Sequence, residues 1–164
     1  MNKLKIIKAT VDQKELIRRL LELYQYDLST ATGNELNQFG LYDYPYLDNY
    51  WTEAKRYPYL LQIDGTTVGF CLVNTYCVLP ENNGAYSIGE FFVLKKYRRL
   101  GVGREVAVRI IKDFPGKWEI RVLEKNEEGK AFWRKVISDL TAGKFAEQSS
   151  DSETWKGLIL SFSI

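Results

Sequence analysis

The spacing of apolar residues changes several times along the chain, and each change predicts a new secondary-structure element. Residues 4–9 form a short apolar run that predicts a strand. Asp12 would cap the helix that follows, and Glu15, three residues on, would complete a capping box. The apolar residues of this helix recur at helical spacing: Leu16, Ile17, Leu20, Leu23 and Tyr24.

Residues 24–51 differ from the rest, because they are rich in tyrosine and contain neither lysine nor arginine. We expect one short second helix here, from about Leu47 to Arg56. The apolar segments 59–63 and 67–74 then predict two strands. Between them stands Asp64-Gly65, a strong signal for a hairpin turn.

The second half of the chain mixes strands and helices. Residues 85–94 are mostly apolar, which predicts a central strand. The remaining segments are a helix at 103–114, a strand at 118–123, a helix at 127–137 and closing strands at 145–148 and 157–164. This order predicts a mixed α/β (α+β) fold with one central sheet, as a single domain over residues 1–164.

Composition narrows the functional classes. The 164 residues suit one domain with one core, and an apolar content of 45% is too high for a disordered chain. A net charge of +2 gives no overall case for binding nucleic acid or an anionic membrane. No signal peptide is visible, and no apolar run approaches the ~20 residues that cross a bilayer, so we expect a cytoplasmic protein.

The chain contains no histidine. This excludes Ser-His-Asp and Cys-His nucleophilic machinery and histidine-ligated metal sites, so we expect no metal. Cys71 and Cys77 do not form a CxxC pair, and we expect both to be buried, inert thiols. Acid–base candidates are therefore Glu, Asp, Tyr, Lys, Cys or an ordered water.

A basic, glycine-containing loop follows the central strand. Gly101 and Gly103 let backbone approach a ligand closely, and N–H groups at a helix start form an anion site. Arg98, Arg99 and Arg104 add guanidinium groups, which can donate two hydrogen bonds to a phosphate. The loop therefore predicts a pyrophosphate site; it is neither a Walker A loop nor a dinucleotide GxGxxG.

At this loop the sequence resembles the GNAT N-acetyltransferases. Their signature is Arg/Gln-x-x-Gly-x-Gly/Ala, and Arg98, Gly101 and Gly103 match its three fixed positions. Val93 matches the valine that the family usually has near the end of the preceding strand. The resemblance covers about residues 60–164 well, and the N-terminal third in element order only.

The resemblance continues downstream of the loop. Asn126 follows the next strand, where the family commonly has an asparagine, and Phe132-Trp133 stands where the family has an aromatic–tyrosine pair. The family's tyrosine is thought to protonate the departing thiolate, but the indole of Trp133 cannot transfer a proton. Trp133 could still bond the sulfur or stack on the pantetheine; core packing of Phe132-Trp133 is an equal alternative.

The resemblance also implies a fold and a reaction. The sheet would be mostly antiparallel, flanked by helices and splayed near Val93, with acetyl-CoA or another acyl-CoA in the gap as co-substrate. An amine would attack the thioester directly in a ternary complex. Asn126 would reach the cofactor from the end of the next strand. The implied backbone contacts are Phe92, Val93 and Leu94 for the pantetheine, and Arg99, Leu100, Gly101, Val102, Gly103 and Arg104 for the pyrophosphate.

Glu90 is the best candidate for a general base. It lies on the central strand three residues before Val93, where many family members carry an acidic residue. A base is needed because an alkylamine with a pKa near 10.4 is mostly protonated at neutral pH. The alternative is a carboxylate at a strand edge that pairs with a lysine or arginine.

The acceptor is indicated by residues 24–54. They hold five acids without a basic residue, and seven tyrosine or tryptophan side chains accompany them. Carboxylates with aromatic faces suit a cationic amine, so we expect a small-molecule or peptide acceptor. An aromatic-packed, solvated loop is the alternative.

Two rivals to an active enzyme remain. One is a catalytically weak or inactive GNAT-like protein that binds acyl-CoA as a sensor or scaffold. The other is an α/β interaction module whose basic loop binds another anion. The sequence also allows a homodimer.

Overall fold

A seven-stranded sheet forms the centre of the computed structural model, which describes residues 3–164. Its strand order is β1-β2-β3-β4-β5-β7-β6. All neighbours are antiparallel except β4 and β5, which are parallel. The strands are β1 Leu4–Lys8, β2 Tyr57–Ile63, β3 Thr66–Asn74, β4 Tyr86–Val93, β5 Lys117–Leu123, β6 Ala146–Asp151 and β7 Lys156–Ser163. This confirms the expected mixed α/β fold with a mostly antiparallel central sheet.

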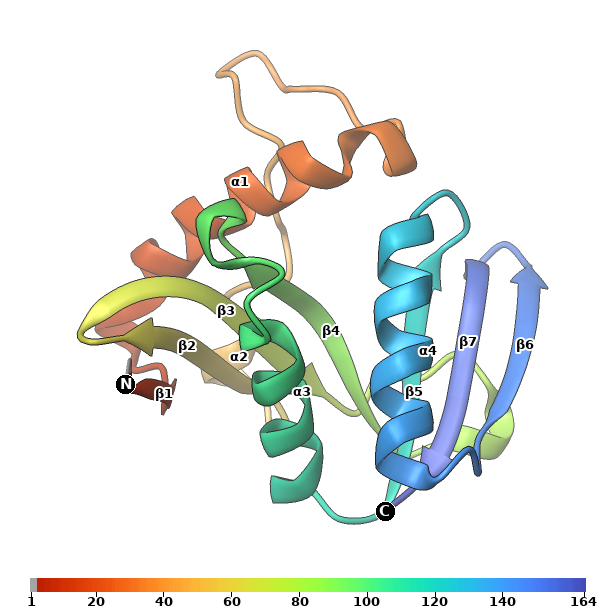
Figure 1. The fold of residues 1–164 in the computed structure, drawn as a ribbon. Helices are drawn as coiled ribbons and strands as arrows, with labels where there is room; N and C mark the ends of the chain where they lie inside the picture. The colour runs from red at the N-terminus through yellow and green to blue at the C-terminus, as the bar shows by residue number, and fades with distance from the viewer. Residues whose placement is uncertain (1–2) are drawn as a thin grey trace.

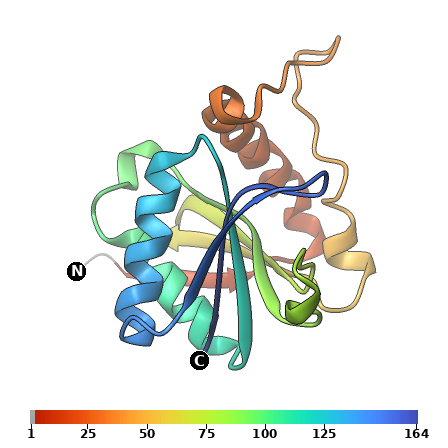
Figure 2. The same cartoon turned by 90° about the vertical axis from the view of Figure 1, so that its right-hand side faces the viewer.

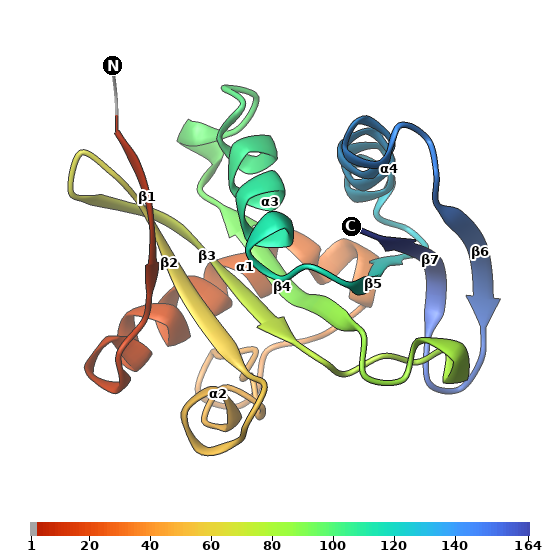
Figure 3. The ribbon, with the colours of Figure 1, turned by 90° about the horizontal axis from the view of Figure 1, so that it is seen from below.

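Helices cover both faces of the sheet (Figures 1 and 2). They are α1 Lys14–Thr32, α2 Asn49–Thr52, α3 Val102–Asp113 and α4 Glu127–Thr141. Seen from below, α1 and α2 lie on one side of the strands and α3 and α4 on the other (Figure 3). Two hydrophobic cores follow from this layering, one under α3 and α4 and one under α1. None of the helices within residues 3–164 is long and apolar enough to cross a membrane.

The strands β4 and β5 part soon after they meet. Their pairing consists of Tyr86 with Trp118 and Ser87 with Glu119, at the start of both strands. Beyond these pairs β4 continues to Val93 and β5 to Leu123 in diverging directions (Figure 1). The sheet is therefore splayed toward the carboxyl ends of β4 and β5, as expected.

A β-bulge at Gly89 bends β4 at the point of divergence. Leu72 of β3 pairs with Glu90, but its neighbour Val73 pairs with Ile88, which leaves Gly89 as the extra residue. A Cβ at Gly89 would lie 2.6 Å from the side-chain nitrogen of Asn74, so only glycine fits here. Because a bulge adds twist to its strand, Gly89 helps to turn β4 away from β5.

The start of α1 differs from the expectation. A 3-10 turn, Val11–Gln13, precedes the helix, and the side-chain oxygen of Gln13 accepts a hydrogen bond of 3.0 Å from the backbone N–H of Thr10. Asp12 lies inside this turn and does not cap the helix, so the proposed box with Glu15 was wrong. The helix also runs on to Thr32 and ends at Gly33, whose φ is 73°.

Two other boundaries moved because strands extend beyond the apolar pattern. Helix α2 is a single turn, since Glu53 is already extended and β2 begins at Tyr57. The polar residues 149–152 predicted a turn after a strand ending at residue 148, but β6 runs on through Ser149 and Ser150 to Asp151, and the turn lies at residues 152–155. Polar residues serve in β6 because it is an edge strand exposed to water.

We predict that Gly69→Ala destabilises the protein. An added Cβ would lie 2.0 Å from the backbone oxygen of Phe92, so β3 and β4 would have to separate. Overpacking of this kind costs about 1–3 kcal/mol in free energy of unfolding. Urea denaturation would measure it, with Thr66→Ala on the exposed hairpin as a control that changes stability by less than about 0.5 kcal/mol. Equal stability of both variants would contradict the close approach of the strands.

Candidate active site

The loop after β4 presents an open helix N-terminus. Gly101, with a φ of 82°, is the N-cap of α3 and has no side chain to cap the helix. The first helical backbone hydrogen bond runs from the amide of Glu105 to the carbonyl of Gly101, at 3.0 Å. The amides of Val102, Gly103 and Arg104 therefore stand in the first turn of α3, where no carbonyl of the helix can accept from them. This geometry suits an anion, as the sequence predicted.

Two of the three loop arginines have side chains in solvent. The side chain of Arg99 is 90% exposed, and its guanidinium lies 3.4 Å from Glu128. Arg104 pairs with Asp139 at the same distance and is 54% exposed. Exposed ion pairs of this kind are weak, so both guanidinium groups can turn toward a phosphate at little cost. Leu100 between them is also exposed.

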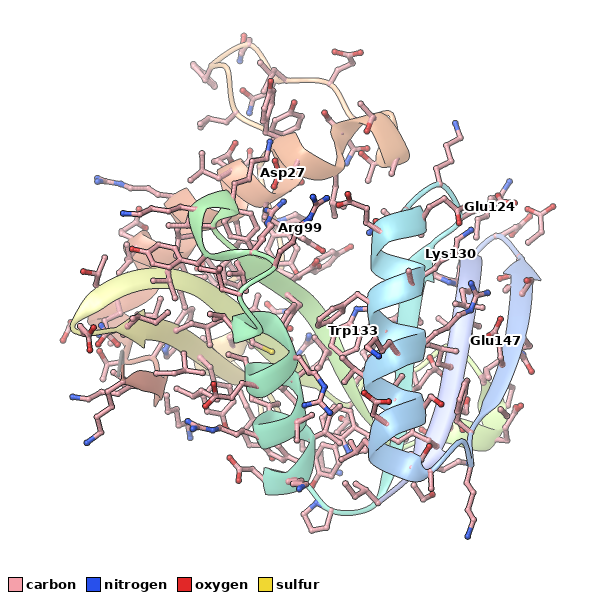
Figure 4. All side chains as sticks on the ribbon, viewed as in Figure 1. Asp27, Arg99, Glu124, Lys130, Trp133 and Glu147 are labelled. Atoms are coloured by element: carbon pink, nitrogen blue, oxygen red, sulfur yellow. The ribbon has the colours of Figure 1, made fainter. Side chains whose placement is uncertain are left out.

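Arg98 is engaged inside the protein. Its Nε donates to the carbonyl of Val93 at 2.6 Å, and its terminal nitrogen donates to Asp27 of α1. The guanidinium also lies over the ring of Phe92, 5.4 Å from the centroid. Figure 4 shows Asp27 above the loop that carries Arg99. Arg98 therefore ties α1 to the end of β4 through two of its three nitrogens, and its expected contact with a phosphate stays a prediction.

Asp27 is the partner that keeps Arg98 in this position. Burial opposes ionisation of its carboxyl group, but hydrogen bonds from Arg98 and Lys95 outweigh burial and lower the pKa of Asp27. The ammonium group of Lys95 lies 3.2 Å from the second carboxylate oxygen and is largely exposed. Asp27 is thus a charged, well-satisfied group that belongs to the fold.

The register of β4 decides which backbone groups face the gap. The amide of Leu94 donates to the carbonyl of Val68 at 2.8 Å, so Leu94 is bonded toward β3. Since bonding directions alternate along an antiparallel strand, Phe92 also bonds toward β3, while Phe91 and Val93 face the side from which β5 has departed. The expected contacts of Phe92 and Leu94 with pantetheine thus have no free backbone groups in this register. Phe91, which the sequence analysis missed, has them.

Aromatic side chains fill the sheet face behind the gap. Phe91 stacks on Phe132 at 5.8 Å between ring centroids and meets Trp133 edge-on at 5.3 Å. Trp133 is 7% exposed and belongs to the core under α3 and α4. It leaves α4 on the side that faces α3 (Figure 4). Phe132 and Trp133 therefore pack in the core, which was one of the two roles expected for them.

Asn126 stands just after β5, across the gap from the loop. Its side-chain oxygen accepts a hydrogen bond of 2.9 Å from the amide of Gly129 and so caps α4. A Cβ at Gly129 would lie 2.6 Å from the side-chain nitrogen of Asn126, so the glycine makes room for the cap. The oxygen of Asn126 is committed to the helix, and the expected cofactor contact would have to use its N–H donors.

Glu90 lies on the opposite face of β4, beneath α1. It is half-buried, and burial raises the pKa of its carboxyl group. Hydrogen bonding to Tyr24 and Tyr44 and the positive charge of Arg121 oppose this rise without cancelling it. A raised pKa makes a carboxylate a stronger base at neutral pH, so Glu90 has the environment that a general base needs.

The two tyrosines stay protonated beside Glu90. Burial and the charge of Glu90 raise the pKa of both Tyr24 and Tyr44 well above the ordinary range. A third tyrosine, Tyr50, accepts a hydrogen bond of 2.9 Å from the amide of Asn74. Burial raises its pKa to about 12. The tyrosine-rich segment therefore does supply an aromatic wall around Glu90.

The acids of residues 24–54, which were expected to attract a cationic acceptor, are mostly paired with cations of the protein itself. Asp27 pairs with Arg98, Asp48 pairs with Lys14 at 3.0 Å, and Glu53 pairs with Arg56 at 3.0 Å. The cations come from outside residues 24–54, so sequence-local counting could not reveal them. Most of the negative charge expected to attract a cationic acceptor is neutralised within the protein.

The cysteines lie away from this chemistry. Cys71 is buried and Cys77 is half-buried, and both are free thiols. Burial raises the pKa of each, that of Cys77 to about 11. Thiols that stay protonated at neutral pH are poor nucleophiles, which agrees with inert residues.

Sequence reasoning missed two charged residues of β5. Glu119 is fully buried and accepts hydrogen bonds from the amides of Val78 and Leu79, at 2.8 and 3.2 Å, and from the side chain of Asn82 at 2.8 Å. Arg121, two residues on, has a side chain that is 15% exposed. In the sequence, both look like ordinary charged residues of a strand, and no neighbouring pattern indicates that they are buried.

Comparison with known proteins identifies the family. Residues 17–137 match the acetyltransferase (GNAT) family. The chain belongs to this family. The GNAT acetyltransferases generally use acetyl-CoA as acyl donor and act on amine acceptors. The search of curated protein sequences gave no match.

Solved structures of similar fold include an acetyltransferase from Thermus thermophilus, with a TM-score of 0.68, 18% identity, and coverage of 98% of this chain and 97% of that chain. A GNAT-family acetyltransferase from Staphylococcus aureus gives a TM-score of 0.63 at 14% identity, covering 98% and 99%. The ribosomal-protein-S18-alanine N-acetyltransferase from Escherichia coli gives 0.61 at 12% identity, covering 99% and 94%. These similarities establish the GNAT fold.

We predict that Arg98→Ala lowers stability by roughly 1–3 kcal/mol, because it leaves the largely buried carboxylate of Asp27 with one exposed partner. Since the pKa of Asp27 is lowered, the loss should be present near neutral pH and shrink as pH falls through that pKa. Lys95→Ala removes the exposed partner of the same carboxylate and serves as the control, with a loss below about 1 kcal/mol. Denaturation curves at several pH values would test this; equal losses for both variants would contradict the assignment.

Proposed function

We propose that the protein transfers an acyl group, in the first place acetyl, from acyl-CoA to a primary amine of a small molecule or peptide. The amine attacks directly in a ternary complex. The observation that carries this proposal is the opening between β4 and β5, which has the open N-terminus of α3 on one face of the sheet and Glu90 on the other. Two substrates can therefore enter from opposite faces and meet at the gap.

The residues present fit the donor substrate. Amides of Val102, Gly103 and Arg104 would hold the pyrophosphate at the start of α3, with Arg99 and Arg104 adding mobile charge. The backbone groups of Phe91 and the N–H of Val93 would bond the amides of the pantetheine arm, as a further strand does at a sheet edge; the carbonyl of Val93 is already held by Arg98. Acyl-CoA supplies the activated thioester; the remaining work falls to the protein's own side chains.

Glu90 performs the proton transfer in this proposal. An alkylammonium must lose a proton before its nitrogen can attack, and Glu90 would accept it directly or through one water. Tyr24 and Tyr44 would hold the carboxylate in place. The indole of Trp133 cannot transfer a proton, so CoA would leave as the thiolate without a general acid, and the second proton of the attacking nitrogen would pass to that thiolate or to water as the amide forms. Positioning of the two substrates would supply much of the rate.

The cofactor loop is tested by Gly101→Val. At a φ of 82° a valine is strained, so the loop would change shape. Acetyl-CoA would then no longer raise the melting temperature of the protein. Gly84→Val is a matched control, because Gly84 has the same φ, likewise has open space around its Cβ position, and lies in the loop before β4. The control should lose stability and keep the shift. A shift retained by Gly101→Val would place the pyrophosphate elsewhere.

The base is tested by Glu90→Gln. Wild-type kcat/KM should fall on the acid side with an apparent pKa above the ordinary glutamate range, because burial raises the pKa of Glu90. The variant should lose this acid limb and about 10²–10⁴-fold in rate. Its stability at neutral pH should not fall, since a raised folded-state pKa means that ionised Glu90 destabilises the fold as pH rises. An unchanged profile would rule Glu90 out as the base.

One result would favour a different function. Binding of acetyl-CoA without transfer to any member of a broad amine panel, measured by CoA release, would favour an acyl-CoA sensor or scaffold. The observation that favours a sensor or scaffold is the deep burial of Trp133 at the position of the family's tyrosine.

A further inference from the structure

We propose that Arg121 selects the acceptor, and that the acceptor is an amino acid, an amine with a carboxylate a few bonds away. The inference rests on the proposed function and deepens it. It starts from the charged groups that flank the opening between β4 and β5 on the face covered by α1.

Glu90 and Arg121 stand at the same level on the two diverging strands. Ser87 pairs with Glu119, the last pair before the strands part. Two positions further along β5 is Arg121. Two positions further along β4, allowing for the extra residue Gly89, is Glu90. If the strands had stayed together these two side chains would be direct neighbours; because the strands diverge, they lie on the two sides of the splay.

Both side chains belong to the same face of the sheet. Trp118, Ile120 and Val122 lie in the core under α3 and α4, so the alternation of a strand turns Arg121 to the other face. Glu90 shares that other face with Phe92, which lies in the core under α1. An acceptor bound beneath α1 would therefore meet both charges.

The guanidinium of Arg121 is held in place but has free donors. Its plane lies over the ring of Trp155, 5.3 Å from the centroid, and one terminal nitrogen donates to the carbonyl of Tyr76 at 3.2 Å. Its Nε is buried, has no hydrogen-bond partner within residues 3–164 and forms an ion pair with Glu119 at 3.8 Å, so the donors within reach of a ligand are those of the terminal nitrogens. Glu119 itself accepts three N–H groups of the 78–82 segment.

A buried arginine with unused donors is suited to a ligand carboxylate. A guanidinium binds a carboxylate through two parallel hydrogen bonds, and its position here needs no further ordering. The positive charge of Arg121 reaches Glu90 through space and lowers the pKa of that carboxyl group, which agrees with their facing each other.

The pair of charges matches one class of acceptor. The amine of an amino acid would face Glu90 and its carboxylate would face Arg121, with Tyr24 and Tyr44 against the rest of the molecule. A polyamine or another purely cationic acceptor would place positive charge near Arg121. The acids of the 24–54 segment cannot compensate, because most of them are paired within the protein.

The wild-type protein gives the first test. We would assay acetyl transfer to the common amino acids, to their carboxamides, and to glycine, β-alanine and γ-aminobutyrate as a spacing series. We expect kcat/KM for at least one acid to exceed that of its amide by about tenfold or more, with one spacing preferred. Transfer at equal rates to acids and amides would overturn the inference and leave the proposed function intact. Transfer to no amine at all would overturn both.

Arg121→Gln gives the second test. It should lower kcat/KM for the preferred acid about tenfold or more beyond the change that it causes for the amide, which reports the effect of Arg121 on the pKa of Glu90, and it should keep the thermal shift with acetyl-CoA. Arg121→Lys should recover part of the preference, since lysine keeps the charge without the bidentate geometry. Arg109→Gln, which removes an exposed arginine of α3, is the control for net charge. Equal losses on acid and amide would overturn the inference, because they would mean that Arg121 only supports the fold.

Discussion

The separation of β4 from β5 is the constraint on which the rest of this structure depends. Two neighbouring strands normally satisfy each other's backbone groups, and unpaired N–H and C=O groups are costly when buried. Here pairing with β5 stops after Ser87 and Glu119, so the backbone groups of Phe91 and the N–H of Val93 have no partner strand, while Arg98 binds the carbonyl of Val93. The binding surface is thus an interrupted sheet, and the bulge at Gly89 is the local device that interrupts it.

Different residues fill the two faces at the point of separation. Under α3 and α4, the rings of Phe91, Phe132 and Trp133 pack together, so this face is aromatic. Under α1, polar groups gather instead, with Glu90 and the tyrosines on β4's side. The same two strands therefore have an aromatic face under α3 and α4 and a polar, titratable face under α1.

The sequence predicted those parts of the candidate site that depend on consecutive residues. The loop from Arg98 to Gly103 has its turn, charge and helix start in consecutive residues, and the structure shows the helix N-terminus expected there. What it could not give were relations between distant residues. Whether Phe91 or Phe92 faces the gap depends on pairing with β3, the partner of Arg98 is 71 residues away, and Arg121 matters only because of what stands across the gap.

The contacts of Arg98 connect helix α1 with the end of β4, and this connection bears on the two proposed substrates. On α1, Tyr24 and Asp27 are three residues apart and so on one side of the helix. Tyr24 packs edge-on against Phe92 of β4, 5.9 Å between ring centroids, and Asp27 holds Arg98, which binds the end of β4. In the proposed ternary complex, a shift of this helix on binding of an acceptor would be passed through Arg98 to the strand end proposed for the acyl donor. Thermodynamic linkage would make such an effect reciprocal, so each substrate would alter the affinity for the other by one and the same factor.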